Sequence, residues 1–310
     1  MAEITLGRLG ARRSKLSRLA RVEERWFYLF ISPWIIGFLA FTAGPMLASL
    51  LFSFTQYDIA HPPKWIGLDN YNTMVHTDLF WKSLGVTTYY SLVSVPLGIV
   101  ISLAIALLLN QRVRGMALFR TIFYTPAVVS GVAVALLWLW MFDSQFGLIN
   151  WGLSLLGIPG PQWLLDENWV IPALIIMSLW GIGGGIVIYL AGLQGIPTEL
   201  YEAAAIDGAN GWHKFLHITL PMMSGVIFFN LIIGIINSFQ VFTQAYIMTG
   251  GGPHYASLFY VLYLYQNAFQ YFNMGYASAL AWVLFLIVLG ITLAVFKSSG
   301  RWVYYEGVRK

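Results

Sequence analysis

Six long stretches of this chain contain no Asp, Glu, Lys, Arg or His. A helix that crosses the hydrocarbon of a bilayer needs about 20 mostly apolar residues, and each stretch is long enough. Charged residues make up only 10% of the chain, against about 25% in an ordinary soluble domain. The sequence therefore predicts an all-α membrane protein with six transmembrane helices. The predicted spans cover residues 26–52, 83–109, 121–142, 169–193, 222–248 and 275–296.

The Lys and Arg side chains predict how these spans are oriented. All but Lys64 and Lys82 of the 17 fall in segments that are cytoplasmic if the N-terminus is inside. Because cytoplasmic segments of membrane proteins are enriched in Lys and Arg, we expect both termini in the cytoplasm. The first apolar stretch is too long for a signal-peptide core and no cleavage site follows it, so we expect it to be retained. The predicted organisation is a basic cytoplasmic segment 1–25, a transmembrane domain 26–297 and a cytoplasmic tail 298–310.

The chain lacks the residues needed for several kinds of catalysis, metal binding and proton coupling. The chain has no cysteine and no G-x-x-x-x-G-K-[ST] phosphate loop. The five histidines fall in the predicted loops without a metal-ligand pattern, and no nucleophile–base set is present. Proton-coupled pumps generally need ionisable groups within the bilayer, and the predicted spans have none. We therefore expect no catalytic and no metal-binding residue. The chain is either a passive conduit or is driven by a partner.

The long connection 194–221 favours the second possibility. Pro197 suits the start of a helix, where its missing N–H costs nothing. Residues 203–205 are three alanines, which favour a helix and let another surface approach closely. Gly208 follows Asp207 and predicts a turn, after which Asn210 is placed to cap a second short helix. We predict two short cytoplasmic helices between the fourth and fifth spans, suited to docking with a partner.

This connection resembles the "EAA" loop of bacterial ATP-binding-cassette importer permeases. The resemblance implies that the loop docks in a cleft of a cytoplasmic ATPase and passes its motion to the membrane helices. ATP and Mg would then be bound by that partner, and this chain would have no cofactor of its own. The residues of the loop that carry the resemblance are Glu202, Ala203, Ala204, Asp207, Gly208, Ala209, Phe215, Ile218, Leu220 and Pro221. The predicted ATPase-coupling residues are Glu202, Ala203, Ala204, Asp207, Gly208 and Ala209.

Other segments are similar to the carbohydrate-uptake branch of the same family. They are residues 66–71, Phe80-Trp81, the run Thr249-Gly-Gly-Gly-Pro253 and residues 302–305. The resemblance implies a complex in the bacterial or archaeal cytoplasmic membrane. It would contain a second, related permease, two copies of the ATPase and an extracytoplasmic sugar-binding protein. Membrane lipid and a sugar are the other expected contacts, and no nucleic acid is expected.

Uncharged polar residues in the spans are the candidates for a sugar pathway. Asn237, Gln240 and Gln244 are spaced to share one face of a helix, and the fourth span adds Ser178 and Trp180. In the maltose-type members of the family these regions contact sugar, so the predicted substrate-binding residues are Asn237, Gln240, Ser178 and Trp180. Amides also hold membrane helices together, and we assign Asn230 and Gln244 to packing.

Two other functions remain open on physical grounds. A facilitator or secondary transporter of small polar solutes would need no ATPase, and dependence of transport on ATP distinguishes it from the importer. A membrane-embedded enzyme would need ionisable residues within the spans, which are absent. The lack of cationic residues in the spans mildly favours a neutral sugar.

Overall fold

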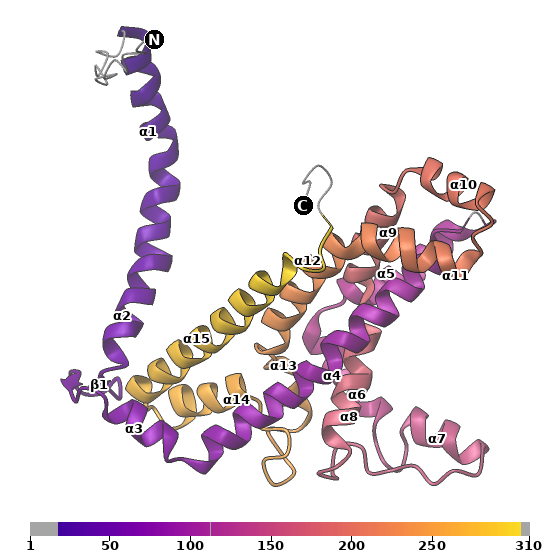
Figure 1. The fold of residues 1–310 in the computed structure, drawn as a ribbon. Coiled ribbons are helices and arrows are strands. Elements are labelled where there is room, and N and C mark those ends of the chain that lie inside the picture. The colour runs from indigo at the N-terminus through magenta and orange to yellow at the C-terminus, as the bar shows by residue number, and fades with distance from the viewer. Residues whose placement is uncertain (1–17, 112, 305–310) are drawn as a thin grey trace, which may run out of the picture. The chain divides into compact units, whose positions relative to one another are not determined.

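A computed structural model describes residues 18–111 and 113–304, so the predicted segments 1–25 and 298–310 lie partly outside the described residues. The chain divides into two compact units, Met1–Leu51 and Phe52–Lys310, and each is described by itself (Figure 1). Within the described residues, four helical runs are long and apolar enough to cross a membrane. The number rises to six if each of two bent helix pairs forms one span. The mostly helical, membrane-spanning character of the chain is as predicted.

The described part of the first unit, from Arg18, is a helical run that continues to Phe52. It consists of α1 (Arg18–Phe38), a π-helical turn η1 (Leu39–Ala43) and α2 (Gly44–Phe52). Pro45 has no N–H to donate to the preceding turn, and the wider π-turn lies directly before it. None of the side chains in this run is buried, although most are apolar.

The second unit begins with a small hairpin that α3 (Asp69–Val75) holds in place. Strand β1 (Thr55–Gln56) pairs antiparallel with β2 (Lys64–Trp65), with Thr55 opposite Trp65. Asn70 is buried and donates from Nδ2 to the carbonyl oxygens of Ser53 and Thr55, both at 2.9 Å. The segment 66–71 therefore has a structural role, because Asn70 satisfies backbone acceptors of the hairpin.

Two of the predicted spans are bent, whereas the second predicted span is not. That span lies within α4 (Asp78–Leu109), which is continuous in spite of Pro96. The prediction of one helix over 121–142 is wrong, because α5 (Met116–Val128) and α6 (Gly131–Met141) meet at 99°. Val129 and Ser130 between them have extended ψ angles of 139° and 135°. Pro126, which lacks an N–H, and Gly131, which helices tolerate poorly, flank this break.

The fourth predicted span is also broken, though less sharply. Helix α7 (Leu148–Leu155) precedes it, and α8 (Val170–Trp180) and α9 (Gly183–Gln194) meet at 48°. Gly183 opens α9 where it crosses α5, and a Cβ there would clash with the carbonyl oxygen of Phe123. The break at Gly181 lies just before a run of three glycines, residues 183–185.

The rest of the chain contains the predicted pair of short helices and the last two spans. The pair is α10 (Thr198–Ile206) and α11 (Gly211–Lys214), followed by the π-turn η2 (Phe215–Thr219). The fifth predicted span lies within the helical run Gly211–Met248, in which four residues separate α12 (Leu220–Ser238) from α13 (Thr243–Met248). Helix α14 (Tyr260–Tyr265), the π-turn η3 (Gln266–Gln270) and α15 (Met274–Ser299) complete the described residues.

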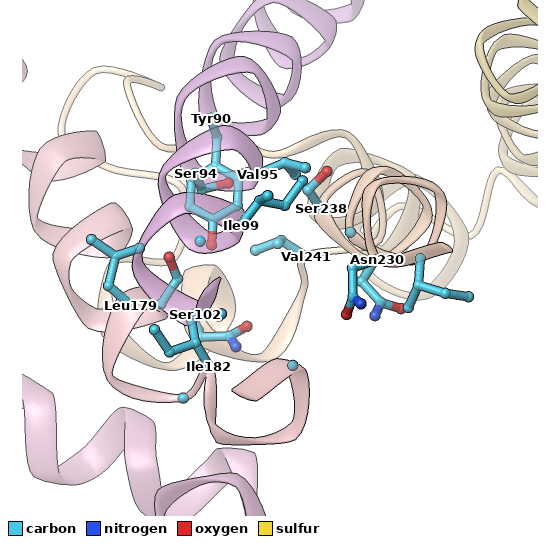
Figure 2. Close-up of a pocket in the computed structure, with 18 of the residues that line it drawn as sticks. Tyr90, Ser94, Val95, Ile99, Ser102, Leu179, Ile182, Asn230, Ser238 and Val241 are labelled. Carbon is cyan, nitrogen blue, oxygen red and sulfur yellow. The ribbon is translucent and has the colours of Figure 1, made fainter. Parts of the chain in front are cut away.

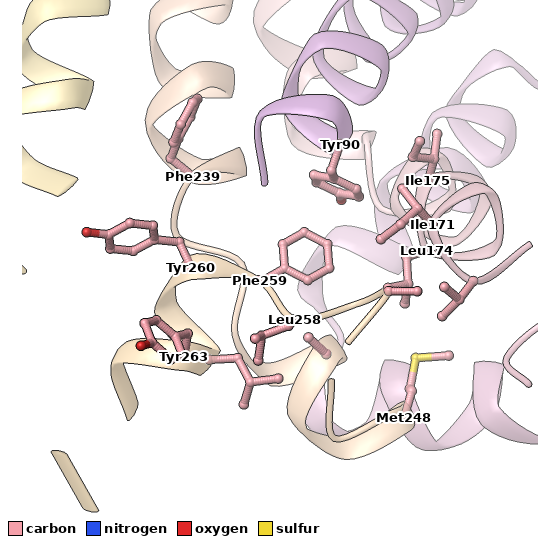
Figure 3. Close-up of a cluster of buried hydrophobic side chains, with 14 of the residues drawn as sticks. Tyr90, Ile171, Leu174, Ile175, Phe239, Met248, Leu258, Phe259, Tyr260 and Tyr263 are labelled. Carbon is pink, nitrogen blue, oxygen red and sulfur yellow. The ribbon is translucent and has the colours of Figure 1, made fainter. Parts of the chain in front are cut away.

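Helices α4, α8, α9 and α12 come together around a cavity (Figure 2). The larger of two buried apolar clusters includes Leu258 and Phe259, close to Tyr90 of α4 and Leu174 of α8 (Figure 3). A second cluster, with Leu103 and Tyr189 among its members, lies further along α4, α9 and α12 toward α10. The cavity is thus held between helices that are packed together at both of its ends.

Candidate functional site

The cavity between α4, α8, α9 and α12 has a volume of about 380 Å³ and an uncharged lining (Figure 2). Its polar side chains come from segments up to about half the chain apart in sequence. They are Tyr90, Ser94, Ser102, Ser178, Tyr189, Asn230, Asn237, Ser238 and Gln244. None of the described residues that line it is an acid, a base or a histidine. Hydroxyl and amide groups can both donate and accept hydrogen bonds, so this lining suits a neutral ligand rich in hydroxyls.

Several of these polar groups are held by their own helices. Ser178 Oγ donates to the carbonyl oxygen of Ile175 at 2.7 Å, and Asn230 Nδ2 donates to that of Val226 at 2.9 Å. The Ser238 hydroxyl lies 2.6 Å from the hydroxyl of Ser91 on α4 and so ties α12 to α4. These hydrogen bonds fix the orientation of the three side chains, and their oxygen atoms keep lone pairs that can accept hydrogen bonds from a ligand.

The structure separates the four predicted substrate residues into two pairs. Asn237 and Ser178 line the cavity, whereas Gln240 and Trp180 are absent from its lining. The prediction that Asn237, Gln240 and Gln244 share a helical face is wrong, because α12 ends at Ser238. The backbone turns after it, with Phe239 buried at 3% exposure and Gln240 exposed. Trp180 packs edge-to-face on Trp138, with ring centroids 6.2 Å apart.

Seven of the nine polar residues that line the cavity were not predicted as substrate-binding from the sequence. Asn230 and Gln244, which we assigned to packing, both line the cavity. Tyr90, Ser94 and Ser102 of α4 also line it, together with Gly98. These four α4 residues are spaced by four, so they follow one face of a helix. That repeat of small or hydroxyl-bearing residues is the signal that could have found them.

Tyr189 is the most deeply buried polar residue of the lining. Its exposed fraction is 1% and its hydroxyl has no hydrogen-bond partner. One turn earlier on α9, Gly185 lets α4 and α12 approach, so that a Cβ there would lie 3.3 Å from Ser102 Oγ and 3.7 Å from Asn230 Oδ1. The end of the cavity toward α10 therefore gathers hydroxyl and amide groups from three helices.

The loop 194–221 owes its shape to local backbone hydrogen bonds. Helix α10 ends where Gly208 adopts a left-handed φ of +78°, a conformation that glycine adopts readily and most other residues avoid. The N–H of Ala209 then reaches back to the carbonyl oxygen of Ala204 at 2.8 Å. Asn210 caps α11 as predicted, because its Oδ1 accepts from the N–H of His213 at 2.9 Å.

The loop presents exposed apolar side chains beside exposed polar ones. Ile206 is 88% exposed and Trp212 is 64% exposed. Glu202, Ala203, Asp207 and Gly208 are exposed as well, while Ala204 and Ala209 are half-buried. Large apolar side chains held in the open on ordered helices mark a surface that another molecule covers. The exposed side chains fit the predicted docking role, but the identity of the docking partner stays a prediction from the sequence.

The loop is joined to the cavity through α12. The Tyr201 hydroxyl of α10 lies 2.9 Å from Thr219 Oγ1, at the last residue of η2. Helix α12 continues from there to Asn230 and Asn237. Residues after α15 pack on the same helix, since the N–H of Tyr304 donates to Ser224 Oγ at 2.8 Å.

Comparisons with known proteins establish the family. Residues 94–298 match the family described as binding-protein-dependent transport system inner membrane component. The chain belongs to this family. The permease is 48% identical over 302 residues to the probable ABC transporter permease protein YesP of Bacillus subtilis, covering 96% of this chain and 97% of that one. It is also 35% identical to the trehalose/maltose transport system permease protein MalF of Thermococcus litoralis, with 91% and 96% covered.

Solved structures of similar fold agree with this assignment. The permease matches a chain of a bacterial ABC transporter involved in the import of the acidic polysaccharide alginate, with a TM-score of 0.81 and 27% identity over 92% of this chain and 99% of that one. A second match, with the same TM-score and 26% identity, is to the alginate transporter in complex with a periplasmic protein that holds an alginate pentasaccharide. It covers 92% of this chain and 98% of that one. The permease is an inner-membrane protein with the fold of an ABC importer subunit.

Proposed function

We propose that this chain is the permease subunit of an ATP-driven sugar importer and that the uncharged cavity is its half of the sugar pathway. The proposal rests on the cavity, whose lining has hydroxyls and amides from five helices and no charged group. A sugar hydroxyl needs donors and acceptors of this kind. Relatives named for trehalose/maltose and for arabinooligosaccharide transport support this ligand class.

In this proposal each bent helix pair crosses the membrane once, which makes six spans with both termini in the cytoplasm. The distribution of Lys and Arg supports this topology, with a basic segment 1–25, a transmembrane domain 26–297 and a cytoplasmic tail 298–310. The side of the protein that carries α10 and α11 then faces the cytoplasm. The first unit, whose apolar side chains lie exposed, supplies the first span.

The loop 194–221 couples the permease to an ATPase. Its exposed Ile206 and Trp212, together with Glu202, Ala203 and Gly208, form the surface that docks into the ATPase. Two copies of the ATPase bind ATP and Mg and supply the work, and a second, related permease completes the pathway. An extracytoplasmic sugar-binding protein delivers the sugar to the opposite side. The alginate transporter crystallised with its periplasmic protein supports that last partner.

The mechanism is mechanical rather than chemical for this chain. ATP binding closes the ATPase pair, the loop moves with it, and α12 carries the motion to Asn230 and Asn237 in the cavity. The cavity then alternates between the two sides of the membrane. The side chains of the cavity hold the sugar through hydrogen bonds and take no part in a covalent step.

One experiment tests the whole proposal. The chain is tagged in its host, extracted in mild detergent, and the proteins that co-purify are identified. We expect a second permease of this family and an ABC ATPase, and ATP-dependent uptake of sugar after reconstitution with the binding protein. Recovery of the chain alone, still moving solute without ATP, would instead establish a facilitator.

A further inference from the structure

The connection between α6 and α8 is unusual for a segment outside the helices that cross the membrane. Residues 144–165 contain no charged side chain and no histidine. The connection between the first two predicted spans, 55–82, differs sharply. It carries Asp58, His61, Lys64, Asp69, His76, Asp78 and Lys82. Water solvates a charged connection such as 55–82 well, whereas an apolar segment such as 144–165 needs an apolar surrounding.

The charged residues of this connection, Asp143, Asp166 and Glu167, lie at its two ends, and the uncharged residues 144–165 between them are held by hydrogen bonds. Asn150 Nδ2 donates to the carbonyl oxygens of Ser144 and Pro161, both at 3.1 Å, and Asn150 Oδ1 accepts from Trp163 Nε1 at 2.7 Å. At the start of the connection, the Asp143 carboxylate accepts from the N–H groups of Phe146 and Gln145 at 2.7 and 2.9 Å. These bonds stabilise the ionised carboxylate and lower the pKa of Asp143.

Helix α7 has two apolar faces. Ile149 and Leu153 pack against the main buried cluster. Leu148, Trp151 and Leu155 lie on another face, spaced by three and four residues, and are 46%, 60% and 67% exposed. We call these three residues the α7 stripe. Four more large apolar residues of the same connection are exposed, namely Phe146, Leu156, Ile158 and Leu165.

The bilayer is the occupant that fits this surface. Leu136, Leu137 and Trp140 on α6 are also exposed and lie just before the connection, so the apolar surface of a candidate span continues onto it. Tryptophan is enriched at the membrane–water boundary, and Trp151 is an exposed member of this surface. A soluble partner that docks and leaves through water finds charged groups in the connection 55–82 and none in residues 144–165.

We propose that residues 144–165 form an interfacial anchor that lies in the membrane surface, with the α7 stripe inserted between lipid headgroups and acyl chains. The anchor fixes the depth of the bend between α5 and α6 and of the start of α8. This proposal rests on the membrane location of the family and does not depend on which solute the protein transports.

The absence of cysteine from the chain makes a direct test possible. Trp151→Cys and Leu155→Cys are each spin-labelled in the assembled complex, in vesicles of phosphatidylcholine and phosphatidylglycerol. Lys64→Cys, at an exposed position in the connection 55–82, is the matched control. Collisions of each label with oxygen, which concentrates in lipid, are compared with collisions with a water-soluble nickel complex.

We expect labels at Trp151 and Leu155 to collide several-fold more with oxygen than with nickel, and the label at Lys64 to show the reverse. Nickel collisions at the α7 stripe equal to those at Lys64 would mean that it faces water, which overturns the proposal. Labels shielded from both reagents would mean that another protein subunit covers the stripe, which overturns it as well. All three substitutions replace exposed side chains, so the complex should still assemble.

Discussion

The cavity and the loop 194–221 are built in opposite ways. The loop takes its shape from residues close together in sequence, with Gly208 turning the chain and Asn210 capping α11. Its remaining side chains lie largely exposed for a partner. The cavity joins residues as far apart as Tyr90 and Gln244, and the hydrogen bond between Ser91 and Ser238 ties two of its helices together. A change in the loop should therefore abolish coupling without altering sugar recognition, whereas a change in the cavity should do the reverse.

The largest expected effect is that of Gly208→Asp, which should reduce sugar uptake to background while the complex still assembles. The left-handed φ of +78° disfavours a side chain, and the new charge would lie in the proposed ATPase interface. The measurement is ATP-dependent uptake together with ATPase activity in vesicles. Gly211→Asp adds the same charge three residues later in the same loop, where a Cβ meets open space and φ is not left-handed, and should reduce uptake less. Normal transport by the Gly208 variant would show that the loop is not the coupling element.

Gly183→Ala should lower the stability of the permease by about 2 kcal/mol, the usual cost of overpacking. The added Cβ would clash with the carbonyl oxygen of Phe123, so α9 would have to move away from α5. Gly184→Ala is the control, because no atom lies within 4 Å of its Cβ position. Thermal unfolding in detergent measures both variants, and equal unfolding temperatures would contradict the close crossing of α5 and α9.

Asn237→Ala should reduce uptake about fivefold, which corresponds to one lost hydrogen bond of about 1 kcal/mol. Assembly and basal ATPase activity should not change, because the side chain is exposed in the cavity. Gln240→Ala, three residues on but outside the lining, should have little effect. Uptake that depends on Gln240 and not on Asn237 would place the pathway elsewhere.

Tyr189→Phe should have the smallest effect on stability. Its effects on stability and on uptake should have opposite signs, which makes the variant informative. The hydroxyl is buried without a partner, at a typical cost of about 1 kcal/mol or more. Its removal should therefore raise the unfolding temperature slightly while it slows uptake, if the hydroxyl meets the sugar during transport. A variant that is stabilised and transports normally would give Tyr189 a packing role alone.

Features that depend on nearby residues could be predicted from the sequence. Long uncharged stretches predict membrane helices, and Asn210 was correctly placed as a cap because capping needs only the next three residues. The end of α12 at Ser238 was missed because the apolar pattern continues beyond it. The α4 face of Tyr90, Ser94 and Ser102 was missed because small polar residues in a membrane helix equally suit helix packing.

The contacts after α15 have a consequence for how force passes through the protein. Tyr304 is hydrogen-bonded to Ser224, and Phe228 of α12 touches the rings of Phe296 and Trp302 at centroid distances of 5.0 and 5.8 Å. These contacts fasten the first turns of α12 to the last turn of α15. A push delivered to the base of α12 therefore meets the stiffness of two helices. The pair should tilt as one rigid lever about the ends furthest from α10.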